Sequence, residues 1–196
     1  MSGRVIAGSA KGRKLKLVPG DTTRPIMDRV KEALFSILTR HIIDATVLDL
    51  FAGTGAVGIE ALSRGARHAT FVDMEKRAID TINDNLRSTN LADRATVRRA
   101  NAFDVLKQSP TPTDLIYIAP PQYLGLWIKS LEALDRAPGW LAEDGIIVVQ
   151  IDPTEQQEVA LQHFAPYDER RYGSTVLWFF EHSSSEVDQD PEESET

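Results

Sequence analysis

The sequence contains no cysteine, and this absence excludes several kinds of chemistry. Without a thiol there is no disulfide, no thiolate metal site and no cysteine nucleophile. The four histidines are scattered without the spacing of metal ligands, so no metal is expected. No apolar run is long enough to span a membrane, and the first residues lack the apolar stretch of a signal peptide. These absences indicate a cytoplasmic protein with no membrane partner.

Acidic residues outnumber basic ones, but the two kinds lie in different parts of the chain. The net charge is −7, yet residues 181–196 carry seven acidic side chains and no Lys or Arg. Residues 1–40 carry nine basic side chains against three acidic ones. The tail, residues 182–196, is too polar to bury a core, and we expect it to be disordered. The basic front end is a weak indication of nucleic-acid binding, which solvated lysines explain better when charge is taken alone.

Apolar periodicity predicts alternating strands and helices along one domain, residues 1–181. We expect a basic hairpin within residues 1–20, a leading helix over 28–40 and a core over 46–181. Core strands are expected at 46–51, 69–73, 95–100, 115–119 and 145–151. Helices are expected at 56–64, 76–88, 103–108 and 124–134, with another starting at Asp152-Pro153.

This pattern predicts an α/β protein with a mainly parallel, doubly wound, Rossmann-like sheet, because each helix is long enough to connect parallel strands. The closing segments ERRYG and STVLWFFE leave no room for a crossover helix between them. They therefore predict an antiparallel edge, which a plain dinucleotide-binding fold does not have.

The stretch DLFAGTGAVG follows the first core strand and fits the G-x-G-x-x-G pattern with Gly53, Gly55 and Gly58. Asp73 follows at the end of the next strand. Glycines let the backbone approach a ligand closely, and an acid at this place can accept hydrogen bonds from two ribose hydroxyls. The pattern fits any cofactor that contains a nucleoside, NAD included, and a structural glycine turn without a ligand is the remaining alternative.

Asp49 distinguishes between these cofactors. It stands at the end of the first core strand, where it directs a carboxylate toward the ligand. The methionine part of S-adenosylmethionine offers an ammonium group to such a carboxylate, whereas the pyrophosphate of NAD would be repelled by it. The sequence therefore favours a methyl donor.

The strand over 115–119 ends in APPQY, where two prolines hold the chain rigid and extended. A stiff loop at a strand end is one explanation. The other is a rigid arm that presents backbone carbonyls and Tyr123 to a substrate. In a doubly wound sheet this arm would leave its strand beside the glycine loop, at the point where ligands bind.

Five stretches, spread in order over residues 4–181, resemble the RsmD family of bacterial methyltransferases, which act on a guanine N2 of small-subunit ribosomal RNA. They read RVIAGSAKGRKL, TRPIMDRVKEALFSIL, LDLFAGTGAVGIEALSRGA, FVDMEKRAI and RRYGSTVLWFF. The resemblance implies a class I S-adenosylmethionine-dependent methyltransferase fold with seven strands, the last one antiparallel. It also implies a 16S ribosomal RNA or small-subunit particle as partner, and we expect a monomer.

The resemblance also assigns roles to individual residues. The cofactor site would comprise Asp49, Phe51, Gly53, Thr54, Gly55, Asp73, Met74, Asn101, Ala102 and Phe103. The RNA would contact Arg4, Lys11, Arg13, Lys14, Arg24 and Arg29. The target amine and base would meet Pro120, Pro121, Gln122 and Tyr123.

The chain departs from the pattern of amino methyltransferases, which is Asp or Asn, then Pro-Pro, then an aromatic residue. Ala119 stands at the Asp/Asn position, Gln122 intervenes before Tyr123, and Ile26 replaces a usual threonine. Ala119 has no side-chain acceptor for the amine, so a non-catalytic RNA-binding assembly factor is one alternative. Others are an amino methyltransferase for DNA or another RNA, and an NAD-dependent oxidoreductase, which would leave APPQY unexplained. The absence of cysteine excludes the thiolate route to C5 of pyrimidines.

Overall fold

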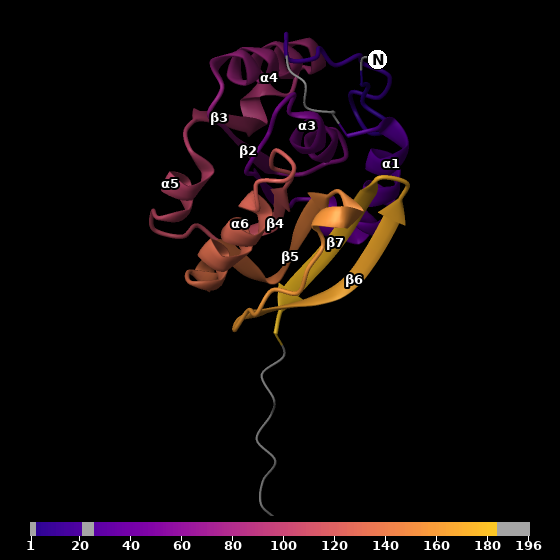
Figure 1. The fold of residues 1–196 in the computed structure, drawn as a ribbon. Coiled ribbons are helices and arrows are strands. Elements are labelled where there is room, and N and C mark those ends of the chain that lie inside the picture. The colour runs from indigo at the N-terminus through magenta and orange to yellow at the C-terminus, as the bar shows by residue number, and fades with distance from the viewer. Residues whose placement is uncertain (1–2, 21–25, 184–196) are drawn as a thin grey trace, which may run out of the picture.

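The computed structural model describes residues 3–20 and 26–183, whose strands form one seven-stranded sheet (Figure 1). The strands are β1 (Thr46–Asp49), β2 (His68–Asp73), β3 (Ala95–Arg99), β4 (Thr113–Ile118), β5 (Leu141–Ile151), β6 (Phe164–Tyr172) and β7 (Thr175–His182). Their order is β3-β2-β1-β4-β5-β7-β6. The first five strands are parallel, and β7 runs antiparallel to both β5 and β6. The predicted class I methyltransferase topology is confirmed.

Helices cover both faces of this sheet. They are α1 (Asp28–Ile37), α2 (Thr39–Ile42), α3 (Ala56–Ser63), α4 (Lys76–Thr89), α5 (Ala102–Leu106) and α6 (Leu126–Asp135), with the 3₁₀ turns η1 (Ala92–Arg94), η2 (Pro138–Trp140) and η3 (Pro153–Glu155). None of the helices in the described ranges is long and apolar enough to cross a membrane.

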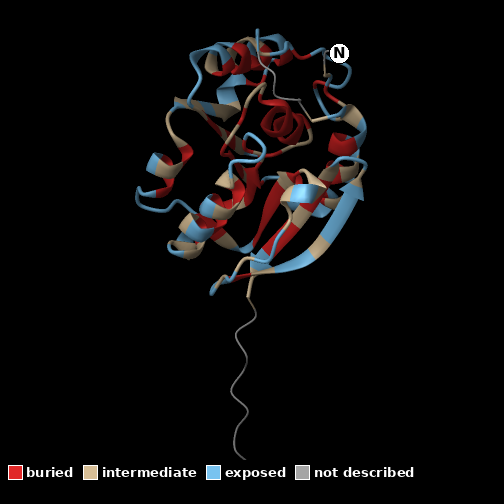
Figure 2. Ribbon diagram, viewed as in Figure 1, coloured by how far each residue is buried: buried red, intermediate tan, exposed pale blue. Residues whose placement is uncertain are grey.

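The strand side chains alternate between two apolar clusters because successive residues of a strand point to opposite faces. Leu115 and Tyr117 of β4 join a cluster with α1, α3 and α4, whereas Ile116 and Ile118 join one with α5 and α6. The central strands are therefore buried on both faces, and β6 at the edge is largely exposed (Figure 2). This explains why the central strands read as continuous apolar runs.

Helix α3 lies unusually close to the sheet. All eight of its residues are buried, and a Cβ on Gly58 would lie 2.3 Å from the Phe71 ring of β2. Only glycine allows this approach, which corresponds to the close helix–strand packing of the third glycine in the G-x-G-x-x-G pattern.

The N-terminal segment folds back on itself and is also bound to helix α3. An antiparallel bridge joins Arg4 and Lys14, and backbone hydrogen bonds flank it, from the Val5 N–H to the Arg13 carbonyl (2.9 Å) and from the Leu15 N–H to the Gly3 carbonyl (2.8 Å). Helix α3 adds to this pairing: the Glu60 carboxylate accepts from the backbone N–H groups of Ile6 (2.8 Å) and Ala7 (3.0 Å). The segment is thus both paired with itself and bound to α3.

Two helices differ from the sequence prediction. The expected helix over 28–40 is divided at Leu38, where the Thr39 hydroxyl donates to the carbonyls of Phe35 and Ser36 at the end of α1. The helix expected at Asp152-Pro153 is only the single turn η3. Asp152 does cap it, accepting from the Thr154 N–H at 2.9 Å, but the chain then runs on without helix to β6.

We predict that Glu60→Ala lowers the free energy of unfolding by about 3–5 kcal/mol, the range for breaking a buried ion pair. Glu60 and Lys31 lie 3.5 Å apart with side chains 0% and 1% exposed, and burial lowers the pKa of Lys31 while Glu60 opposes that change. Urea unfolding measures the loss. The control Asp80→Ala removes the exposed pair with Lys76 and should cost less than about 0.5 kcal/mol. Equal losses would contradict the prediction.

Candidate functional site

The candidate site lies at the carboxyl ends of β1 and β4. These two strands are neighbours, in register from Val47–Leu115 to Asp49–Tyr117, and the strand order changes direction between them. Open α/β sheets bind ligands outside the carboxyl ends of strands at this switch point. The topology therefore brings together the three segments singled out in the sequence, namely Asp49, the glycine loop and APPQY.

The glycine loop has a backbone that only glycine adopts easily. Gly53 and Gly55 have φ angles of 54° and 75°, in the left-handed region. The Gly53 N–H donates to the Asp73 carboxylate at 2.9 Å, and the Glu75 N–H donates to its other oxygen at 2.9 Å. Asp73 thus fixes the loop as well as presenting its remaining lone pairs at the site.

Asp49 is a buried carboxylate with an unsatisfied oxygen. It is 1% exposed, and its Oδ1 has no hydrogen-bond partner among the described residues. Burial raises the pKa of Asp49 to about 7, and the nearby Asp73 carboxylate adds to the rise, while backbone N–H groups of Gly58 and Phe51 oppose it. A buried carboxylate with a free oxygen is suited to receive a cation that donates hydrogen bonds. The Asp49 carboxylate therefore fits an ammonium group, which is such a cation.

The side of the site beyond β2 and β3 contains the residues expected around an adenine. Met74 is 58% exposed and lines a shallow depression of about 340 Å³ together with Arg99, Ala100 and Asn101. The Phe51 and Phe103 rings meet edge to face with centroids 6.5 Å apart. Ala102 is buried at the start of α5, which Asn101 caps by accepting from the Phe103 N–H at 2.9 Å.

The APPQY arm projects from the end of β4. Pro120 is buried, whereas Pro121, Gln122 and Tyr123 are exposed. Tyr123 has a φ of 63°, unusual for an aromatic residue. Its N–H donates to the Glu155 carboxylate at 2.7 Å, so η3 holds the arm in this conformation.

The basic residues expected to meet RNA are mostly at the surface. Lys11, Arg13, Lys14 and Arg29 are exposed, and in the described part of the chain none of them forms an ion pair. Arg4 is exposed and pairs with Asp28 at 3.3 Å. Arg24 lies outside the described residues.

Sequence reasoning missed two residues that shape the site. Asn85 of α4 is fully buried and donates to the Thr54 carbonyl of the glycine loop at 2.9 Å. Its signal was a polar residue between Ile82 and Leu86 on the apolar face of a helix. Glu155 gave no signal, because its contact with Tyr123 joins segments far apart in the sequence.

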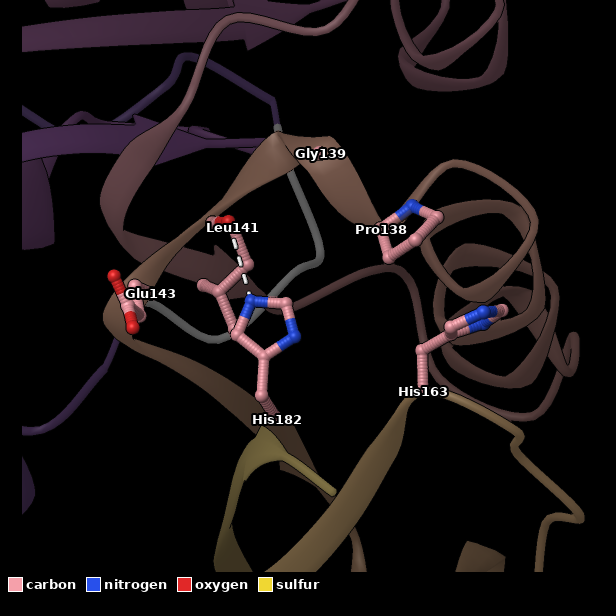
Figure 3. A pocket seen from close by; sticks show the side chains of 6 residues that line it. All are labelled: Pro138, Gly139, Leu141, Glu143, His163 and His182. Atoms are coloured by element: carbon pink, nitrogen blue, oxygen red, sulfur yellow. Dashed lines mark hydrogen bonds between the residues drawn. The ribbon is translucent and has the colours of Figure 1, made fainter. Parts of the chain in front are cut away.

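A second depression, of about 400 Å³, lies at the opposite end of the sheet, where β5 begins and β7 ends (Figure 3). It is lined by Pro138, Gly139, Leu141, Glu143, His163 and His182. The His182 ring lies 3.2 Å from the Leu141 carbonyl. No group of three or more potential metal ligands occurs here or elsewhere in residues 3–20 and 26–183.

Sequence comparison identifies relatives along most of the chain. The family described as "Conserved hypothetical protein 95" matches residues 3–181. Ribosomal RNA small subunit methyltransferase D of Escherichia coli K12 is 40% identical over 147 residues, which cover 75% of this chain and 73% of the relative. The protein of the same name from Haemophilus influenzae is 34% identical over 152 residues, with 76% and 78% covered.

Structural comparison agrees with the sequence relatives. The structure of the putative methyltransferase yhhF from E. coli superposes with a TM-score of 0.84 at 33% identity. The superposition covers 94% of this chain and 100% of the yhhF chain. An RNA methyltransferase from Salinibacter ruber, solved in complex with S-adenosyl-L-homocysteine, has a TM-score of 0.63 at 14% identity, with 85% and 98% covered. The latter likeness shows the shared fold.

We predict that Asp49→Asn stabilises the ligand-free protein more at pH 8 than at pH 5. The folded-state pKa of about 7 lies above the ordinary value of 3.8, so between these values the folded state binds more protons than the unfolded state. The free energy of unfolding of the parent therefore falls as pH rises through this window. The variant does not show this fall, because the Asn side chain does not titrate. Urea unfolding should show an advantage for the variant that grows by about 2–3 kcal/mol from pH 5 to pH 8. The same difference at both pH values would refute it.

Proposed function

The chain belongs to the RsmD family of bacterial ribosomal RNA methyltransferases, and from this premise we propose that it methylates the exocyclic N2 amine of a guanine in 16S ribosomal RNA. S-adenosylmethionine is the donor. The observation that carries the proposal is the unsatisfied carboxylate oxygen of Asp49 beside the glycine loop, in a chain 40% identical to ribosomal RNA small subunit methyltransferase D. A pyrophosphate cofactor would be repelled by that carboxylate.

The cofactor is held by residues from three strand ends. Asp49 accepts from the ammonium group of the methionine part, and the backbone of Gly53 to Gly55 allows that part to approach closely. Asp73 accepts from the ribose hydroxyls with the lone pairs that its bonds to Gly53 and Glu75 leave free. The adenine lies against Phe51, Met74 and the segment Asn101, Ala102 and Phe103. When bound, S-adenosylmethionine supplies an electrophilic methyl group.

The APPQY arm positions the guanine. The Pro120 carbonyl accepts a hydrogen bond from the N2 amine, and Gln122 supplies the second acceptor that Ala119 lacks. Pro121 keeps the arm rigid between them. The exposed Tyr123 ring stacks on the base once it is flipped out of the RNA. The amine nitrogen would form its bond to the methyl carbon as the sulfur–methyl bond breaks, which leaves S-adenosylhomocysteine, and the nitrogen would then lose a proton to water. The arm's contribution is alignment and the orientation of the nitrogen lone pair.

The RNA backbone is bound by the basic front end. Arg4, Lys11, Arg13 and Lys14 lie together on residues 3–18, and their exposed side chains are available to phosphates. Arg29 lies in the first turn of α1 and is also exposed, and we propose the same role for Arg24. We propose that the protein acts as a monomer in the cytoplasm, on 16S RNA alone or in the small-subunit particle.

The function is tested by methyl transfer to 16S ribosomal RNA from a strain that lacks the gene. We expect the purified protein to add one methyl group to a guanine, which nuclease digestion and mass spectrometry locate. Calorimetry should show binding of S-adenosylhomocysteine but not of NAD, and Asp49→Asn should weaken that binding at least about tenfold, the value of one hydrogen bond to a charged group. Binding of NAD without S-adenosylhomocysteine would overturn the proposal.

Ala119 favours a second candidate, an RNA-binding assembly factor that has lost turnover. Two variants separate it from the enzyme. If Gln122 is the second acceptor, Gln122→Ala lowers the single-turnover rate about 10–100-fold, the loss of one hydrogen bond to an amine that gains charge in the transition state, with unchanged cofactor affinity. If the chain is a decayed enzyme, the parent transfers methyl groups at a barely measurable rate, and Ala119→Asp raises that rate because it restores the side-chain acceptor. An active parent unaffected by Gln122→Ala would remove Gln122 from the mechanism.

A further inference from the structure

Buried polar side chains fasten the N-terminal segment, residues 3–18, to α3 and α4. Glu60 holds the backbone at Ile6 and Ala7. The Ser63 hydroxyl accepts from the Ala10 N–H at 2.9 Å and donates to the Ala7 carbonyl at 2.6 Å. Figure 1 shows this segment, in indigo, passing beside α3 and α4. The segment that carries the basic residues is therefore a fixed part of the fold.

The third attachment, Asn85, also holds the glycine loop. Its Oδ1 accepts from the Lys16 N–H at 2.8 Å, and its Nδ2 donates to the carbonyls of Lys16 at 3.1 Å and of Thr54 at 2.9 Å. A primary amide has two donor hydrogens, and here both are used, one toward each segment. The side chain is 0% exposed, so water does not replace either bond.

This arrangement makes the two segments interdependent. Thr54 stands between Gly53 and Gly55, whose left-handed φ angles define the loop. A shift of the Thr54 carbonyl breaks or bends its bond to the Asn85 amide, and the same planar amide fixes Lys16. Any ligand that restrains one segment thereby lowers the cost of ordering the other.

We propose that Asn85 is a positioning residue that couples cofactor binding at the glycine loop to RNA binding by the N-terminal segment. The inference rests on the proposed function, because it takes the loop as the cofactor site and the basic segment as the RNA site. Coupling is reciprocal: the cofactor tightens the RNA by the same factor as the RNA tightens the cofactor.

The test measures the affinity for S-adenosylhomocysteine by calorimetry with and without a saturating 16S ribosomal RNA fragment. In the parent we expect the RNA to tighten the ligand at least about fivefold, the lower end of ordinary coupling. In Asn85→Ala the two ligands should still bind separately, but the ratio should fall close to one. A merely structural role would weaken either affinity and leave the ratio unchanged.

Ser63→Ala is the matched control. It also removes buried hydrogen bonds between the N-terminal segment and a helix, but it does not touch the glycine loop. This variant should weaken RNA binding, leave the affinity for S-adenosylhomocysteine alone unchanged, and keep the coupling ratio of the parent. Loss of coupling in Ser63→Ala to the same degree as in Asn85→Ala would contradict a specific role for Asn85.

Hydrogen exchange on the parent protein gives a second test that needs no variant. S-adenosylhomocysteine should slow exchange of the Lys16 amide, whose N–H donates to Asn85, without RNA present. If both ligands bind but neither the affinity ratio nor the Lys16 exchange changes, the coupling is absent and the proposed function stands. If the RNA does not bind or no methyl group is transferred, the proposed function fails first.

Discussion

The buried carboxylate of Glu60 is the interaction on which the arrangement of this site depends. It forms ion pairs with Lys31 of α1 and with Arg64, the latter at 2.8 Å. It also accepts hydrogen bonds from two backbone N–H groups of the N-terminal segment. Because Glu60 belongs to α3, these contacts unite the helix that begins at the glycine loop with α1 and with the basic segment. An ion pair of this kind gives little net stability, but loss of one partner is costly, so it specifies one arrangement of the three elements.

Much of the sheet follows from sequence because its determinants are local. Continuous apolar runs in β4 and β5, the left-handed glycines and the short connection between β6 and β7 each read directly from neighbouring residues. What could not be read depends on contacts across the chain. The N-terminal residues pair with one another, but their attachment to Glu60 and Ser63, more than fifty positions away, has no local signal in the sequence. Glu155 and Asn85 shape the site in the same way, through partners 32 and 31 residues distant.

Of the two carboxylates of the site, Asp73 influences the charge of Asp49 and so the charge of the ligand that the site favours. Asp49 is buried, and Asp73 raises its pKa further, so negative charge on Asp49 is unfavourable while the site is without ligand. An ammonium group on the ligand would relieve that charge, whereas a phosphate would add to it. The burial also raises the pKa of the Tyr117 phenol, which stays neutral and donates to Gln150 beneath the site. The preference for a cationic ligand is therefore a property of the strand ends, independent of the glycine pattern that many nucleotide-binding proteins share.

The APPQY arm shows how the fold accommodates one residue more than the usual amino methyltransferase pattern. With Gln122 inserted, an extended chain would carry the aromatic side chain one position farther from β4. Tyr123 instead takes a left-handed φ of 63°, which turns the chain, and the Glu155 carboxylate accepts its N–H at 2.7 Å. Such a conformation costs on the order of 1 kcal/mol for a residue with a Cβ, so it persists only where a partner such as Glu155 holds it. The second oxygen of Glu155 is buried without a hydrogen-bond partner among the described residues, a further cost at the same point. The fold thus keeps a strained, exposed Tyr123 beside the switch point, and residues held in such conformations cluster at functional sites.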